Sequence, residues 1–209
     1  AGILCVGGGP GIWQCTISGS QNANTRWSRG VVAQGSMGRL RIQESVIDGG
    51  LALEDCYGVE VTDDSAGAIE ESTITVTSGS IAGGIRVDGD SNVHITRNVI
   101  TVGGSACESA EGISIRGSNP YIEDNTITCT EATAETTVIS AGVSSDPHIG
   151  RNALHAGAAP RTAGIVLWNN PVGDVLITQN HIYGGIATTS STGVSCSDSN
   201  VRIRNNIIH

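Results

Sequence analysis

Four aspartates are the residues best suited by type and spacing to bind a metal ion. Asp63 and Asp64 follow one Gly-Val segment, and Asp88 and Asp90 follow a similar Gly-Ile segment further along the chain. Carboxylate oxygens are the ligands that a hard cation such as Ca²⁺ prefers. If the two segments lie side by side, the four carboxylates meet, and the sequence predicts a Ca²⁺ site. The alternative is an ordinary role in turns, because no complete loop motif with fixed ligand spacing is present.

A second candidate is a sugar-binding turn. Trp168 is followed by Asn169 and Asn170, so an indole ring stands next to two amides. Aromatic faces offer sugar rings an apolar contact, and amides can bond their hydroxyls. We therefore expect Trp168, Asn169 and Asn170 to stack on and hydrogen-bond a glycan, with Trp13 and Trp27 as further stacking residues. The alternative is that Trp168 packs under its own loop.

Both candidates lie within a repeat that covers the whole chain. An isoleucine recurs every 26 to 30 residues, followed three positions later by a polar or small residue and two further on by an apolar one. Self-similarity at such a period indicates a repeat architecture. The leading isoleucines are Ile12, Ile42, Ile69, Ile95, Ile122, Ile149, Ile177 and Ile203.

Each unit alternates apolar and polar residues with the period of a β-strand. In one unit, Ile85 and Val87 are expected to point inward and Arg86 outward. The alternation breaks at Ile-x-x-Asn-x-Ile, so the chain must turn a corner there, with asparagine in the left-handed backbone conformation that it tolerates. Stacked coils then align the asparagines as a hydrogen-bonded ladder. Its members are Asn98, Asn125, Asn152, Asn180 and Asn206.

The segments Gly84–Ile100 (GIRVDGDSNVHITRNVI) and Gly112–Ile127 (GISIRGSNPYIEDNTI) resemble parallel β-helix repeats of the pectate-lyase-like superfamily. The similarity is to its carbohydrate-binding and sugar-hydrolase variety, and it extends over the whole chain. It implies an extracellular, cell-surface or periplasmic protein. Together with the repeat it predicts an all-β fold, a single-stranded right-handed parallel β-helix of about eight coils of about 27 residues, as one domain, 1–209. A leucine-rich repeat is excluded because the other half of each unit is also a strand.

The residue before each ladder position is predicted to point outward. Coils lie about 4.8 Å apart, so Glu71, Arg97, Asp124 and Arg151 should form an alternating series of ion pairs. Carboxylates neutralised in this way are poor general acids, and the sequence therefore leans against an enzyme. The full column is Gln14, Glu44, Glu71, Arg97, Asp124, Arg151, Gln179 and Asn205.

Histidines, cysteines and threonines carry weaker signals. His94 and His148 share an outward column but lie two coils apart, which is too far for one metal ion. Pairing of Cys5 with Cys15, or of Cys107 with Cys129, is the disulfide hypothesis, and buried free thiols are the alternative. Two threonine series suggest an ice-binding face interrupted by other residues. They are Thr73, Thr75 and Thr77, and Thr126, Thr128 and Thr130.

Composition excludes some partners. The net charge is −9 and the chain has 11 basic residues, all of them arginine, so nucleic acid and anionic membranes are not expected partners. No stretch of 18 apolar residues predicts a membrane span. Neither end shows a capping element, and the chain is expected to be uncapped at both ends.

These observations predict a structural or interaction β-solenoid that self-associates or continues end to end, with no cofactor other than the candidate Ca²⁺. End-to-end stacking of this kind does not close and would build a filament. A carbohydrate-binding or polysaccharide-cleaving module is the alternative function, and an ice-binding protein is the weaker alternative.

Overall fold

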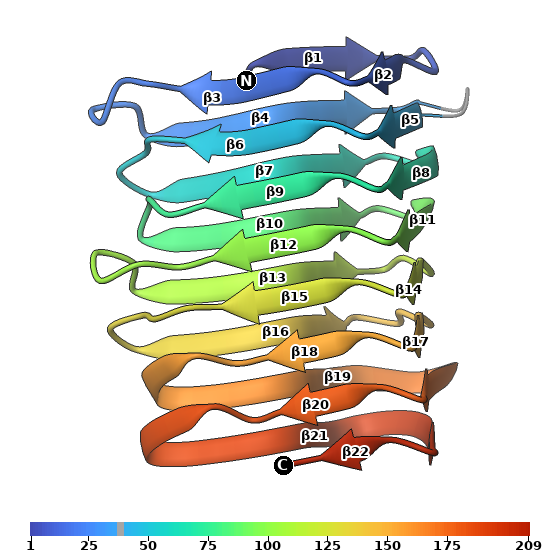
Figure 1. The fold of residues 1–209 in the computed structure, drawn as a ribbon. Coiled ribbons are helices and arrows are strands. Elements are labelled where there is room, and N and C mark those ends of the chain that lie inside the picture. The colour runs from blue at the N-terminus through green and yellow to red at the C-terminus, as the bar shows by residue number, and fades with distance from the viewer. Residues whose placement is uncertain (37–39) are drawn as a thin grey trace.

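In a computed structural model, residues 1–36 and 40–209 are described, and they form strands but no helix. The strands stack in parallel as a solenoid of about 7 turns of about 27 residues (Figure 1). The all-β parallel solenoid predicted from the repeat is confirmed, whereas its right-handed sense stays a prediction. Among the described residues, no helix is long and apolar enough to cross a membrane.

Each turn contributes one strand to each of three faces. The long-strand run consists of β1 (Ile3–Val6), β4 (Trp27–Gln34), β7 (Asp55–Thr62), β10 (Ile81–Asp88), β13 (Ser109–Arg116), β16 (Glu135–Gly142) and the first part of β19 (Ala158–Thr178). The short-strand run consists of β2 (Gly11–Trp13), β5 (Leu40–Gln43), β8 (Ala66–Glu70), β11 (Asn92–Thr96), β14 (Tyr121–Glu123), β17 (His148–Gly150) and the last part of β19. Because β19 belongs to both runs, they form one 14-stranded sheet, and β21 (Ile186–Arg204) pairs with β19.

The third face is a separate 8-stranded sheet. It consists of β3 (Thr16–Ser20), β6 (Val46–Gly50), β9 (Thr73–Val76), β12 (Val99–Val102), β15 (Thr126–Cys129), β18 (Ala153–His155), β20 (His181–Tyr183) and β22 (Ile207–Ile208). All pairings on the three faces are parallel, as a coil stacked on the next coil requires.

The core is the column of apolar side chains that the repeat predicts. The leading isoleucines pair in register through every turn, from Ile12 with Ile42 to Ile177 with Ile203. The second apolar positions do the same on the 8-stranded sheet. From Ile47 to Ile182 these second positions are fully buried, so the predicted inward stacking is confirmed.

The asparagine ladder is confirmed, with one correction. Asn98, Asn125, Asn152 and Asn180 are buried, and each backbone N–H donates to the side-chain oxygen of the next ladder residue. The left-handed residue is not the asparagine, however, but the residue before it, with φ between 50° and 57° at all eight corners. The preceding residue makes the turn, which leaves asparagine free to point inward and bond along the axis.

A second ladder stands at the other end of the short strands. Here a serine hydroxyl accepts a hydrogen bond from the backbone N–H of the serine one coil earlier, as Ser91 does from Ser65 and Ser118 does from Ser91. At the last step, the side-chain oxygen of Asn170 accepts from Ser145 N–H at 2.7 Å. The ladder consists of Ser36, Ser65, Ser91, Ser118, Ser145 and Asn170. Each short strand is therefore held at both ends.

Candidate functional site

The four aspartates of the proposed Ca²⁺ site lie at the corner between the long and short strands. Asp63, Asp64 and Asp90 have positive φ angles, a conformation that aspartate tolerates better than most residues. Asp63 accepts a hydrogen bond from the Gln34 amide at 2.7 Å, and Asp88 pairs with Arg86 at 2.8 Å.

No group of three or more potential metal ligands forms within residues 1–36 and 40–209. The structure therefore gives the predicted Ca²⁺ site at Asp63, Asp64, Asp88 and Asp90 no support. Two of the four, Asp63 and Asp88, already have side-chain partners in Gln34 and Arg86.

The three residues of the expected sugar-binding turn lie in different environments. The Trp168 ring lies against Gly142 of the preceding coil, where a side chain would collide with it. Asn169 is exposed, but Asn170 is fully buried in the serine ladder and donates to the Ala141 carbonyl at 3.1 Å. Asn170 therefore cannot bond a ligand beside the indole ring, which corrects that part of the prediction.

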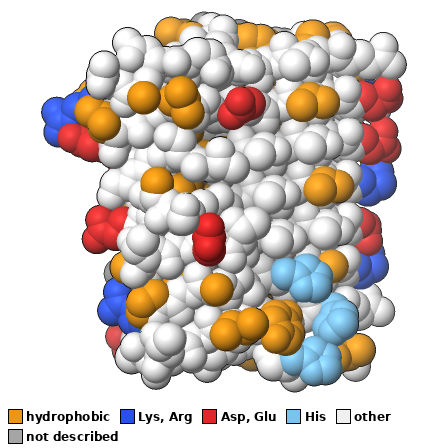
Figure 2. Space-filling view, turned by 60° about the vertical axis from the view of Figure 1, so that its left-hand side comes forward, with side chains coloured by type: hydrophobic (Ala, Val, Ile, Leu, Met, Phe, Trp, Pro, Cys, Tyr) orange, Lys and Arg blue, Asp and Glu red, His pale blue; other side chains and the backbone are white. Residues whose placement is uncertain are grey.

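Ion pairs form in the outward column, but as separate pairs rather than as one series. Arg97 meets Glu71 at 2.8 Å, and Arg151 meets Asp124 at 2.8 Å. Figure 2 shows acidic and basic side chains gathered along its right-hand edge. The hydrogen bonds from these arginines lower the pKa of the Glu71 and Asp124 carboxyls. Carboxylates held ionised in this way do not serve as proton donors near neutral pH.

The structure also gives the state of the cysteines and the arrangement of the threonines. All six cysteines are free, so neither predicted disulfide forms. Burial raises the pKa of Cys56 and Cys129 to about 12, which removes them as nucleophiles. On the 8-stranded sheet, Val99 stands between Thr73 and Thr126 and interrupts that threonine column. In the neighbouring column, Thr75, Thr101 and Thr128 are continuous over three coils, and Asp48 and His155 bound them.

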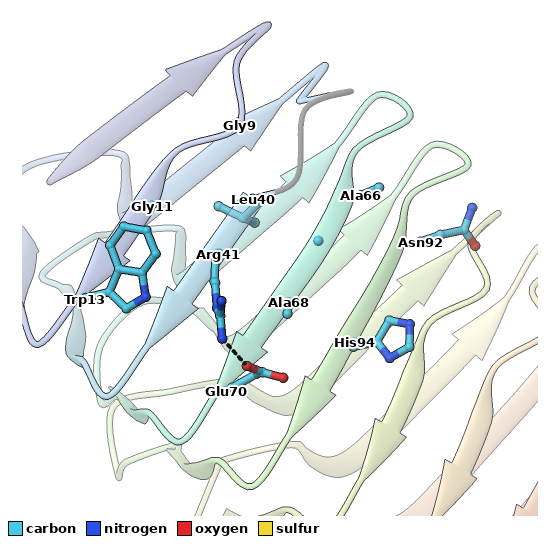
Figure 3. Close-up of a pocket in the computed structure, with 11 residues that line it drawn as sticks. Gly9, Gly11, Trp13, Leu40, Arg41, Ala66, Ala68, Glu70, Asn92 and His94 are labelled. Atoms are coloured by element: carbon cyan, nitrogen blue, oxygen red, sulfur yellow. Dashed lines mark ion pairs between the residues drawn. The ribbon is translucent and has the colours of Figure 1, made fainter.

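A groove runs along the outer surface of the short-strand run. Its first part is a cavity of about 660 Å³ over β2, β5, β8 and β11 (Figure 3). The outward column here reads Gly11, Arg41, Ala68 and His94, coil by coil. Small residues, with Ala66 beside Ala68, form the floor between larger side chains, which is why this face is hollowed.

The walls of this cavity carry an exposed indole and an ion pair. The side chain of Trp13 is 53% exposed and its ring lies over Gly11. Arg41 reaches Glu70 on the next coil at 3.7 Å, so the two side chains form an ion pair on the cavity wall (Figure 3). Together they offer an apolar face next to hydrogen-bond donors and acceptors.

The groove continues towards the C-terminus. A second cavity, of about 330 Å³, shares Asn92 with the first one and lies over β14 and β17. Between the two, the His94 and Tyr121 rings stack at 5.0 Å, and the His148 ring follows at 5.6 Å. His94 and His148 do share a column, as predicted, and Tyr121 separates them. The second cavity is lined by Asn92, Asn119, Tyr121, Asp146, Pro147, His148, Asp174 and Leu176.

The acids near this second part are also engaged. Glu123 meets Arg151 at 2.9 Å and lies 3.8 Å from His148 Nε2. Asp174 forms an ion pair with Arg202, and Asp146 accepts a hydrogen bond from the Asp174 N–H. His148 Nε2 is buried without a hydrogen-bond partner among the described residues. The groove therefore carries ion pairs and hydrogen-bonding groups along its length.

Reasoning from the sequence identified only parts of this groove. The sequence suggested Trp13 as a stacking residue and placed His94 and His148 in one column. It did not indicate that Tyr121 lies between the two histidines, or that small residues form the floor of the groove. The signal was present in the repeat alignment, as the column that contains Gly11, Arg41 and Ala68.

No family model, no curated protein and no solved structure matches the chain.

Proposed function

We propose that the short-strand groove binds a linear glycan without cleaving it. The observation that carries the proposal is the alignment of two cavities along the solenoid axis, with exposed rings from three coils between and beside them. From β2 to β17 the groove crosses five coil steps of about 4.8 Å each, or roughly 24 Å in all. An extended polymer fits this shape better than a compact ligand.

Aromatic faces supply the apolar part of the binding. Trp13 at one end and Tyr121 near the middle are each about half exposed, at 53% and 48%. Rings of this kind provide large contact area at low cost in conformational entropy, and they pack against the C–H face of a sugar. Their separation along the axis leaves space for several sugar units.

Polar groups supply the specificity. Arg41, Glu70 and Asn92 line the first cavity, and Asn119 and Asp146 line the second. Because the arginines are paired with acids and the chain has a net charge of −9, we propose a neutral glycan rather than a polyanionic one. A glycan ligand accords with a location outside the cell, on its surface or in the periplasm.

A glycan array with the purified chain tests this proposal. We expect retention of one class of neutral glycan, loss of that retention in Trp13→Ala and Tyr121→Ala, and no change in Trp27→Ala. Trp27 is the matched control because it is 54% exposed but lies in the long-strand run, where Arg26 stacks on it at 4.8 Å. Equal losses in all three variants, or no retained glycan, would contradict the proposal.

We also propose that copies of the chain associate end to end. Ile203 and Ile208 occupy inward columns in which Ile177 and Ile182 are fully buried, yet they are 44% and 47% exposed. Another coil stacked on this edge would bury them and pair the free strand edge. A second copy is the occupant that we propose, and repeated head-to-tail contacts of this kind would build a filament.

Light scattering across a dilution series of the 209-residue chain measures this association. We expect mass to rise with concentration, and Ile208→Arg to abolish the rise because it buries a charge in the contact. A mass that stays monomeric over the whole series would overturn the proposal.

A further inference from the structure

Two histidines meet on the 8-stranded sheet, away from the groove. His181 begins β20, and His209 follows β22 on the next coil. Both are exposed, and their ring centroids lie 5.1 Å apart with an interplanar angle of 57°. Figure 2 shows histidine side chains gathered at the lower right of this face.

The backbone holds the second histidine in place. His209 N–H donates to the Ile182 carbonyl at 2.9 Å, and Gly184 N–H donates to the His209 carbonyl at 3.0 Å. The parallel pairing of His181 with Ile207 sets the two rings diagonally across neighbouring strands. The coil-to-coil register thus brings the two side chains to neighbouring positions on the surface.

That separation suits one shared metal ion. An ion bound to one nitrogen of each ring at about 2.0–2.1 Å, with a tetrahedral angle between the bonds, places the ring centroids about 5.2 Å apart. The observed separation is 5.1 Å. We propose that His181 and His209 bind a divalent transition-metal ion such as Zn²⁺ or Ni²⁺.

The ligand set decides the class of metal. Imidazole suits Zn²⁺, Ni²⁺ and Cu²⁺, whereas Ca²⁺ and Mg²⁺ require oxygen ligands. Because no group of three or more metal-binding side chains forms in the described part of the chain, water completes the coordination. The site is therefore open on its outer side and accessible to ions from solution.

His155 provides a matched control on the same face. It is exposed like the other two, but it pairs in register with Tyr183, and Tyr183 separates it from His209 along the column. The register of Ala153 with His181 also sets His155 diagonally across from His181, on the preceding coil. Replacing His155 therefore tests whether His181 shares the ion on that side instead.

Titration calorimetry with Zn²⁺ tests the proposal, with the thiols first alkylated so that exposed cysteines do not contribute. We expect saturable one-to-one binding that His181→Ala and His209→Ala each abolish and His155→Ala retains, with no heat from Ca²⁺. In parallel, Ni²⁺ should broaden the NMR signals of His181 and His209 before those of His94. Absence of saturable binding, or an equal loss in His155→Ala, would overturn the proposal. Thermal melts of the variants confirm that each one is folded.

Discussion

The two corners that bound each short strand meet the same need with different side chains. At the asparagine corner, Asn125 donates to the Ile95 carbonyl of the preceding coil and to Asn152 of the following coil, while its oxygen accepts from Asn98 N–H. At the serine corner, Ser118 accepts from Ser91 N–H and donates within its own coil, to the Arg116 carbonyl.

The two corners differ in the number of coils that one side chain links. One asparagine links three coils, because its amide group has two N–H donors as well as an acceptor oxygen. One serine side chain links two, because its single O–H is donated within its own coil. A hydrogen bond lost in the interior leaves an unpaired group whose burial costs free energy. The asparagine corner should therefore be the stronger constraint on coil stacking.

Replacing Asn125 with leucine should have the largest effect. It leaves Asn98 N–H and the Ile95 carbonyl without their partners in a buried corner, at a cost of about 1–3 kcal/mol. Urea unfolding followed by circular dichroism measures the change. An unchanged midpoint would show that the ladder does not stabilise the stack.

Replacing Ser118 with alanine should have a smaller effect. Ser91 N–H loses its acceptor, whereas the Arg116 carbonyl loses the serine hydroxyl but keeps the Gly89 N–H. We therefore expect a loss of about 1 kcal/mol, at the lower end of the range for one unpaired group. The same urea titration compares it directly with Asn125→Leu. A loss larger than that of the asparagine variant would reverse the proposed order of the two corners.

Replacing Arg151 with glutamine tests the outward residues beside the asparagine corner. The pair with Asp124 is exposed, so the expected loss is about 0.2–1 kcal/mol. Because Arg151 lowers the pKa of Asp124 in the folded chain, the contribution is present at neutral pH. It is lost as the pH falls through that lowered pKa. Unfolding midpoints of both proteins, measured from neutral to acidic pH, should converge at the acidic end.

Replacing Ala68 with tryptophan should change stability least. Ala68 lies on the groove floor between the two corners and points outward, so a larger ring fills the cavity without entering the core. We expect a stability change within about 0.5 kcal/mol together with loss of glycan retention. Retained glycan binding would show that the glycan does not bind in the groove.

How far the sequence could predict these features depends on periodicity. The inward columns, the asparagine ladder and the pairs of Asp124 and Glu71 with arginine follow from the repeat, because each coil repeats its neighbour's register. The position of the left-handed residue did not follow, since the break in alternation does not say which residue turns. The serine ladder was missed because serine is also common in ordinary turns.

The candidate sites were harder to predict than the fold. The spacing of Asp63 and Asp88 places them one coil apart, but it does not reveal that Gln34 and Arg86 already engage them. The groove is hollow because residues on its floor, such as Gly11 and Ala68, have small side chains. A search of the sequence for reactive side chains does not find such residues. Its volume arises only once the coils are stacked.

The asparagine ladder has a consequence for how the length of such a chain can change during evolution. Asn98, Asn125 and Asn152 present nearly the same bonds to the coil before and the coil after, with donor–acceptor distances of 2.7 to 3.1 Å. A coil removed or duplicated by recombination would meet matching partners on both sides of the junction. The chain can therefore lengthen or shorten by whole coils during evolution. The groove on the outer surface would lengthen or shorten with it.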